Sequence, residues 1–177
     1  MNKIRLSSCL LFLALLITSS CSTIDKIDRK GQDLPIDANN FQKLNGSFSK
    51  GANLFDLLND RKAFPKKLKT DSTMVVTISV INNKAIKLEF VTEGKTVNTT
   101  TLNGSFVKGY FSNTKISVFL KFFPLLWGPG SHELRLGLTK DNNLAVLESH
   151  GGIAIFLVLP FFGGGGEGTF ELKRKID

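Results

Sequence analysis

Residues 73–90, TMVVTISVINNKAIKLEF, decide the fold because apolar and polar residues alternate along most of this stretch. The apolar positions are Met74, Val76, Ile78 and Val80 in the first half, and Ile86, Leu88 and Phe90 in the second half. Alternation with a period of two is typical of a half-buried β-strand. Asn82 and Asn83 lie between the two halves and favour a tight turn. The stretch therefore predicts a β-hairpin.

The same alternation continues on both sides of this hairpin from Leu44 onward. Further strands are expected at residues 96–101, 105–111, 116–123, 132–139, 144–149, 153–162 and 169–173. Only residues 53–59 (NLFDLLN) have leucines at a helical spacing. The pattern predicts an all-β domain of about 8–10 short strands, with one short helix after the first strand.

A domain of many meandering strands needs a way to protect its edge strands. Closure of the sheet achieves this, so we expect an antiparallel up-and-down β-barrel. A β-sandwich of two sheets is the alternative. The 177 residues suffice for one domain of this kind with a substantial core.

Residues 1–20 have the three parts of a secretory signal peptide. Lys3 and Arg5 supply the positive charge, residues 10–17 (LLFLALLI) form an apolar run, and residues 18–20 are small. The run is much shorter than the roughly 20 residues with which a helix crosses a bilayer. We therefore expect a cleaved signal, and an uncleaved anchor helix is the alternative.

The segment ITSSC at residues 17–21 resembles the lipobox of bacterial lipoproteins, in which the cysteine is acylated and becomes the first residue after cleavage. The resemblance implies lipid attachment at Cys21, through acyl chains such as palmitate. Several acyl chains together hold a protein firmly at a membrane. An ordinary secretory signal followed by an unmodified cysteine is the alternative.

Residues 21–40 are polar and charged and are interrupted by Gly31 and Pro35, so they predict a flexible tether. Residues 41–177 are then a single β-barrel domain. Removal of Lys3 and Arg5 with the signal lowers the formal net charge from +8 to +6, which suits contact with anionic lipid head groups or glycans. Nucleic acid is not an expected partner of an exported protein.

Two segments of the chain are nearly identical: LNGSFSKG at residues 44–51 and LNGSFVKG at residues 102–109. One interpretation is the duplication of half a barrel. The other is a motif that starts a strand in both places, with Asn-Gly in a turn and phenylalanine facing inward. The flanking sequences do not repeat, which favours the shared motif.

Several further segments carry a resemblance to a family. They are LNG at 44–46, LFDLL at 54–58, LNGSFVKGYF at 102–111, LRLGLTKDNNL at 134–144 and TFELK at 169–173. Over residues 44–175 the chain resembles small exported lipoproteins of Bacteroidetes with a lipocalin-like (calycin) barrel. Such lipoproteins are largely uncharacterised, so the resemblance implies a fold and a place in the cell envelope but no activity.

Motifs of catalysis are missing from the chain. It has no Gly-x-Ser-x-Gly segment, and GGGGEG at residues 163–168 lacks the Lys-Ser/Thr ending of a phosphate-binding loop. His132 falls on the apolar side of its expected strand, and His132 and His150 have no carboxylates at metal-ligand spacing. We therefore expect no catalytic residues, no metal and no cofactor, and a protein that is not an enzyme.

Residues 122–130 (FFPLLWGPG) predict a loop, because they contain proline and glycine, yet they carry five large apolar residues. Exposed apolar residues in a loop mark a contact site. The first hypothesis is therefore that the barrel binds a hydrophobic or lipid-like small molecule. Its tentative ligand-binding residues are Leu88, Phe90, Phe123, Trp127, Leu134 and Leu136. The alternative is a structural or protein-interaction lipoprotein whose barrel is filled by its own side chains.

Ser22 follows the cysteine at the place where an aspartate retains some lipoproteins in the inner membrane. We therefore expect a lipid-anchored protein of the cell envelope, on the periplasmic or surface face of the outer membrane. Its expected partners are the membrane, through the N-terminal lipid, and either a hydrophobic small molecule or an envelope protein.

Overall fold

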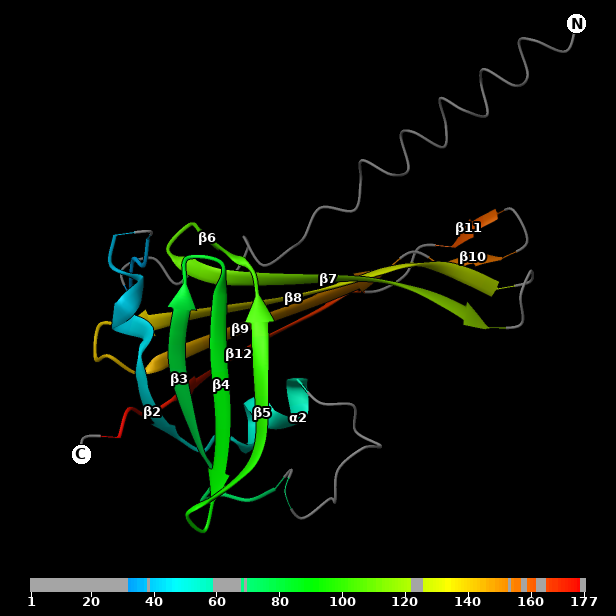
Figure 1. Cartoon of the computed structure of the whole chain (residues 1–177). Helices are drawn as coiled ribbons and strands as arrows, with labels where there is room; N and C mark the ends of the chain where they lie inside the picture. Colours follow the sequence, from blue (N-terminus) through cyan, green and yellow to red (C-terminus); the bar gives the residue numbers. More distant parts are fainter. Residues whose placement is uncertain are drawn as a thin grey trace, which may run out of the picture. The chain divides into compact units, whose positions relative to one another are not determined.

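The structure is a computed structural model that describes residues 32–37, 39–58, 68, 70–121, 126–152, 154–156, 159–161 and 165–175 (Figure 1). Antiparallel strands make up most of it, which confirms the prediction of an all-β protein. The described residues fall into two compact units. The larger unit lies within residues 28–115, 133–148 and 168–177, and the smaller unit lies within residues 116–132 and 149–167.

The larger unit begins with β1 (Asp33–Leu34), the 3-10 helix η2 (Phe41–Leu44), β2 (Gly46–Ser49) and α2 (Ala52–Leu58). Four strands follow: β3 (Val75–Asn82), β4 (Ala85–Thr92), β5 (Lys95–Asn103) and β6 (Ser105–Val107). The remaining strands are β7 (Tyr110–Lys121), β8 (Leu126–Thr139), β9 (Leu144–Gly152), β10 (Ala154–Phe156), β11 (Leu159–Phe161) and β12 (Gly166–Leu172). The helix predicted at residues 53–59 is confirmed as α2.

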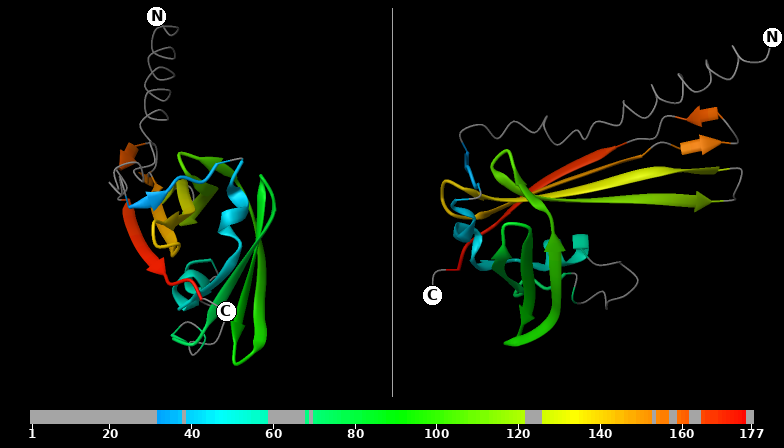
Figure 2. Two further views of the ribbon diagram at one scale, coloured as in Figure 1. Left: turned by 90° about the vertical axis from the view of Figure 1, so that its left-hand side faces the viewer. Right: turned by 45° about the horizontal axis from the view of Figure 1, so that its top comes forward.

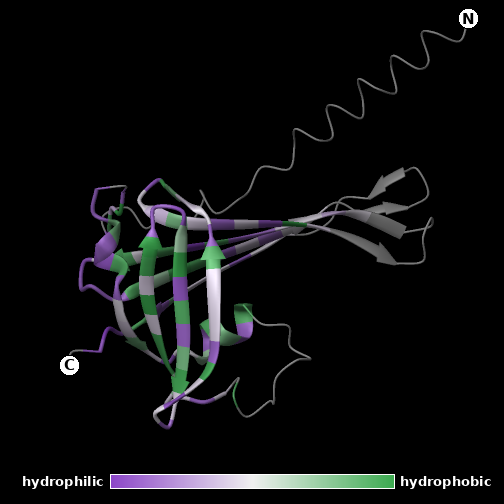
Figure 3. Cartoon of the chain, in the orientation of Figure 1, coloured by the Kyte–Doolittle hydropathy of each residue, from purple (hydrophilic) through white to green (hydrophobic). Residues whose placement is uncertain are grey.

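A four-stranded sheet with the order β2-β3-β4-β5 contains the predicted hairpin as β3 and β4. Ile78 lies opposite Leu88 in this pair, and apolar and polar residues alternate along β4 (Figure 3). Strands β3, β4 and β5 lie side by side in all views (Figures 1 and 2). Glu93 and Gly94 connect β4 to β5 with positive φ angles of 50° and 74°. Two positive φ angles are typical of the tight turn that suits the twist of a hairpin.

The second sheet has the order β11-β10-β8-β7-β6, with β1 also paired to β8, and β9 paired to both β8 and β12. One strand was expected at residues 105–111, but the structure has β6, a turn and β7 in this place. The reason is the turn at Lys108 and Gly109, where both residues have positive φ angles, 51° and 87°. Lysine rarely adopts this conformation, so the sequence gives little warning of it.

The two sheets meet at two places in the larger unit. Only Gly104 separates the end of β5 from the start of β6. At the other side, Phe48 in β2 forms an antiparallel bridge with Arg174, directly after β12. Ser49 N donates to the Lys173 carbonyl oxygen and Lys175 N donates to the Ser47 carbonyl oxygen, each at 2.8 Å. The strands nevertheless form two sheets, so the predicted closed barrel is not confirmed.

The core of the larger unit is one continuous cluster of buried apolar side chains from both sheets and from α2. Phe55 of α2 packs edge-on against Phe90 of β4, with ring centroids 5.2 Å apart. Leu54 and Ala52 from the same helix are also buried in this cluster. The helix therefore contributes side chains to the interior between the strands.

The smaller unit corrects two expectations for the apolar segments. Residues 122–130 were expected to form a loop, yet from Leu126 onward they belong to β8, and residues 122–125 lie outside the described residues. A single strand was expected at residues 153–162, where the structure has β10 and β11 paired with each other. Strand β8 pairs with β10 as a third strand beside this hairpin, with Trp127 opposite Ile155.

The segment that was expected to be a tether contains a strand and a buried residue. The tether was expected to reach Asn40, but Asp33 and Leu34 pair with the end of β8, and Ile36 is buried in the core. One domain was expected at residues 41–177, where the chain forms two compact units. The signal peptide expected at residues 1–20 and the lipid attachment expected at Cys21 lie outside the described residues. Among the helices that the structure describes, none is long and apolar enough to cross a membrane.

Candidate functional site

Four of the six tentative ligand-binding residues come together in the core of the larger unit. Leu88 and Phe90 of β4 and Leu134 and Leu136 of β8 are all at most 1% exposed and belong to the same buried cluster. Trp127 belongs to the smaller unit, in β8, where only its backbone is described. Phe123 lies outside the described residues.

The burial of these four residues shows whether their side chains line an open cavity or pack against other side chains. A side chain that lines an open cavity keeps surface that a water-sized probe can reach, whereas a packed side chain keeps almost none. The four side chains keep almost none, and the ring of Phe55 covers Phe90 from the helix side. They are therefore packed against protein side chains in the structure.

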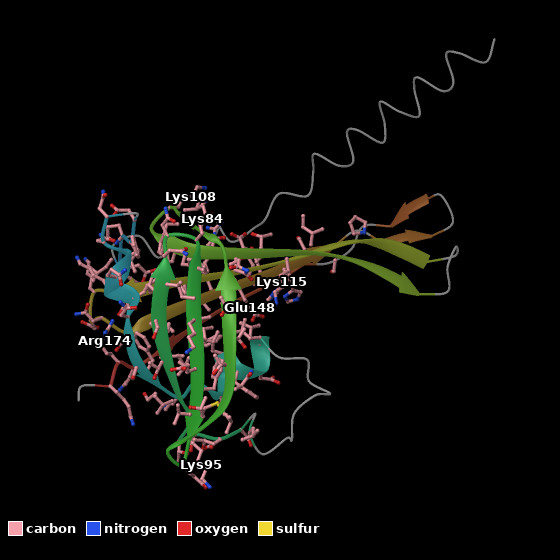
Figure 4. All side chains as sticks on the ribbon, in the orientation of Figure 1. Lys84, Lys95, Lys108, Lys115, Glu148 and Arg174 are labelled. Atoms are coloured by element: carbon pink, nitrogen blue, oxygen red, sulfur yellow. The ribbon has the colours of Figure 1, made fainter. Side chains whose placement is uncertain are left out.

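Arg174 is a residue with a structural role that the sequence patterns did not indicate. Its guanidinium lies over the Phe48 ring, 4.9 Å from the centroid. Nη1 donates to the Asn45 carbonyl oxygen at 2.9 Å, and Nη2 donates to that of Lys43 at 3.0 Å. Nε donates to the Asn142 carbonyl oxygen at 3.0 Å. One side chain thus joins η2, the start of β2 and the β8–β9 turn (Figure 4).

Gly46 leaves room for this guanidinium. Its φ angle is +151°, and a Cβ atom at this position would lie 2.4 Å from Arg174 Nη1. Phe48 beneath the guanidinium is fully buried. The segment LNGSF at 44–48 therefore does more than start a strand, because it forms one half of the contact that holds the C-terminal segment. The signal in the sequence was an arginine between Lys173 and Lys175 in a chain that has few arginines.

Glu133 and Arg135 form a buried ion pair on the face of β8 opposite the core. Glu133 Oε1 accepts from Arg135 Nε at 2.7 Å and from Ser112 Oγ at 2.8 Å. Both charged side chains are only 10% exposed. Glu133 alternates with Leu134 along β8, and its side chain is nevertheless buried. An arginine and a hydroxyl that both bind a carboxylate favour its charged form and occupy one of its oxygens, so Glu133 is poorly placed to act as a base.

The two histidines do not form a reactive cluster in the described chain. His132 is half-buried in β8, and His150 is exposed near the end of β9. Gly166 packs closely on the His150 ring, because a Cβ atom there would lie 2.6 Å from two ring atoms. Among the described residues, no group of three histidine, cysteine or acidic side chains could hold a metal ion.

Comparisons of the chain with protein-family models, with curated proteins and with solved structures gave no match.

Proposed function

We propose that this chain is a non-enzymatic, lipid-anchored protein of the cell envelope whose larger unit is a filled β-barrel. In this proposal the protein acts through its surface, as a structural or interaction protein, and holds no small molecule inside. The observation that carries the proposal is the packing of Leu88, Phe90, Leu134 and Leu136 in one core with α2.

The order of the strands supports a barrel. Strands β2 to β5 form an antiparallel series, and the chain continues through Gly104 into β6 and β7. The second sheet continues the series through β8 and β9 to β12. The bridge between Phe48 and Arg174 then brings the chain after β12 back to β2. Closure of this kind leaves fewer open strand edges.

The N-terminal sequence supports the anchor. The positive start, the short apolar run and the segment ITSSC before Ser22 together resemble a lipoprotein signal. An acylated Cys21 would hold the larger unit at a membrane without a membrane-crossing helix. The resemblance to exported Bacteroidetes lipoproteins supports the same location.

A test of the filled interior is a larger side chain at a core position. In a filled core the extra atoms of Leu136→Phe force neighbouring side chains out of place, at a cost of about 1–3 kcal/mol in the free energy of unfolding. We expect urea unfolding to show this loss. If the variant is as stable as the original protein or more stable, the extra ring has filled a cavity, and the barrel is a ligand-binding one. Ile81→Phe is the matched control, because Ile81 is 55% exposed and the substitution should change little.

A further inference from the structure

The ends of four strands in the smaller unit form a short sheet of unusual composition. At this end the order is β11-β10-β8-β7, with Ile155 of β10 opposite Trp127 of β8 and opposite Pro160 of β11 (Figure 1). The described residues of the two segments that supply it are 118–121, 126–129, 152, 154–156 and 159–161. Apart from Lys121, these two segments contain only apolar residues, glycine and proline. We call this end of the sheet the apolar tip.

Both faces of the apolar tip are apolar. Neighbouring residues of a strand lie on opposite faces of a sheet. In β10 the neighbours are Ala154, Ile155 and Phe156, and in β11 they are Leu159, Pro160 and Phe161. A strand of the larger unit, such as β4, instead alternates apolar with polar residues. A sheet with one face in water would keep that alternation, so the tip is built to be surrounded.

A row of glycines on neighbouring strands separates the apolar tip from the polar part of the sheet. A Cβ atom on Gly130 of β8 would lie 3.2 Å from Ser117 Oγ of β7, and one on Gly152 of β9 would lie 3.1 Å from the Pro129 carbonyl oxygen. A Cβ atom on Gly165, directly before β12, would lie 2.9 Å from the His150 carbonyl oxygen of β9. Polar residues follow at once on the other side of this row: Lys115, Ser131, His132, Ser149, His150 and Glu167.

A lipid surface fits these features better than a protein partner does. A protein that docks on one face of the tip leaves the other apolar face in water, and a second copy paired at a strand edge leaves both. A bilayer surrounds both faces at once. Lys115 is exposed beside the boundary and Lys121 lies within the tip, so both charges complement anionic head groups. Trp127 is of a residue type that is enriched at membrane interfaces.

The unpaired strand edges limit how deeply the apolar tip can insert into a membrane. Strands β7 and β11 are the edges of this end of the sheet, and unpaired backbone groups are not tolerated deep in hydrocarbon. Three residues of β10 or β11 span about 10 Å. This length matches the depth of about 5–10 Å that interfacial elements reach.

We infer that the apolar tip inserts into the interface of one leaflet of the membrane that carries the protein. The inference deepens the proposed function and rests on its envelope location. It gives the protein a second membrane contact, separate from the lipid on Cys21, and so fixes the smaller unit against the bilayer.

The test uses Trp127, which is the only tryptophan of the chain. The mature protein is extracted from its native membrane and reconstituted in vesicles of phosphatidylethanolamine and phosphatidylglycerol. Bromine on the acyl chains, placed either near the head group or near the chain end, quenches tryptophan fluorescence at that depth. We expect loss of Trp127 emission with the shallow bromine and little loss with the deep bromine.

Two variants control this measurement. Trp127→Phe with Ile81→Trp moves the single tryptophan to an exposed position of β3 in the larger unit, and we expect no quenching there. Ile155→Glu places a charge opposite Trp127 and should abolish the quenching of Trp127, whereas Ile81→Glu should leave it unchanged. Circular dichroism confirms that each variant keeps its β-structure.

Unquenched Trp127 in vesicles that carry the acylated protein would overturn the inference and leave the proposed anchor intact. If the unquenched protein also crosslinks to a second copy through the tip, a dimer covers this surface instead. The opposite outcome is quenching of Trp127 in a protein whose mass shows no acyl group on Cys21. The inference would then stand, and the lipid anchor of the proposed function would be wrong.

Discussion

At the scale of single residues, we expect the Arg174 side chain to contribute to the free energy of unfolding. Its guanidinium donates to the carbonyl oxygens of Lys43, Asn45 and Asn142 and lies over Phe48. Hydrogen bonds from a charged donor and a cation over an aromatic ring each stabilise a fold. We predict that Arg174→Ala lowers the free energy of unfolding by about 1–3 kcal/mol in urea titrations. Arg174→Lys should recover little, because lysine lacks the planar fork. Equal losses for Arg174→Ala and for the exposed control Lys173→Ala would contradict this role.

Two ion pairs of the larger unit make a matched comparison at the same scale. Each pair joins residues two apart on one strand at 2.7 Å, but Glu133 and Arg135 are buried whereas Lys87 and Glu89 are substantially exposed. Removal of the arginine leaves a buried carboxylate without its ion-pair partner in the first pair only. We predict that Arg135→Met costs about 3 kcal/mol of unfolding free energy. Lys87→Met should cost less than about 1 kcal/mol. Chemical denaturation of both variants measures the difference, and similar costs would show that burial of the pair is unimportant.

At the scale of elements, α2 contributes three buried side chains, Ala52, Leu54 and Phe55, to the core. Phe55 reaches Phe90 across the core, and both rings are fully buried. We predict that Phe55→Ala costs about 3–5 kcal/mol, because it leaves a cavity beside Phe90. Asn53→Ala, on the exposed side of the same helix, should change stability by less than about 0.5 kcal/mol. Thermal or urea unfolding distinguishes them. A small effect of Phe55→Ala would mean that the helix is not part of the core.

The same scale shows what could be predicted from the sequence and what could not. The β3–β4 hairpin and α2 were predicted correctly, because period-two alternation and leucine spacing are local patterns. The break between β6 and β7 was missed, since Lys108 with positive φ has no strong local signal. Strand β1 was missed because it has two residues and pairs with Thr139 and Leu138, far along the chain.

The candidate site shows the same limit. Alternation predicted correctly that Leu88, Phe90, Leu134 and Leu136 face inward. It could not predict whether the space between them holds a ligand or the side chains of α2, because that depends on the distance between strands. The role of Arg174 was missed for a related reason. Its partners Lys43 and Asn45 lie more than a hundred residues earlier in the sequence.

At the scale of the whole molecule, the proposed anchor predicts where the protein is found. We expect the original protein in the membrane fraction, with a mass that shows acyl chains on Cys21. Cys21→Ser removes the acylated atom, so it should yield no acylated protein and a chain that retains its signal peptide. Mass spectrometry of both proteins measures this. An original protein cleaved before Cys21 but carrying an unmodified thiol would contradict the lipid anchor.

The central claim of a filled interior is tested most directly by native mass spectrometry of the protein extracted from its own membrane with a mild detergent. The account predicts the mass of the acylated mature chain and nothing more, even after incubation with an extract of membrane lipids. A reproducible additional mass of a hydrophobic molecule, bound at one copy per chain and retained in the Ile155→Glu variant, would contradict it. The larger unit would then be a ligand-binding barrel.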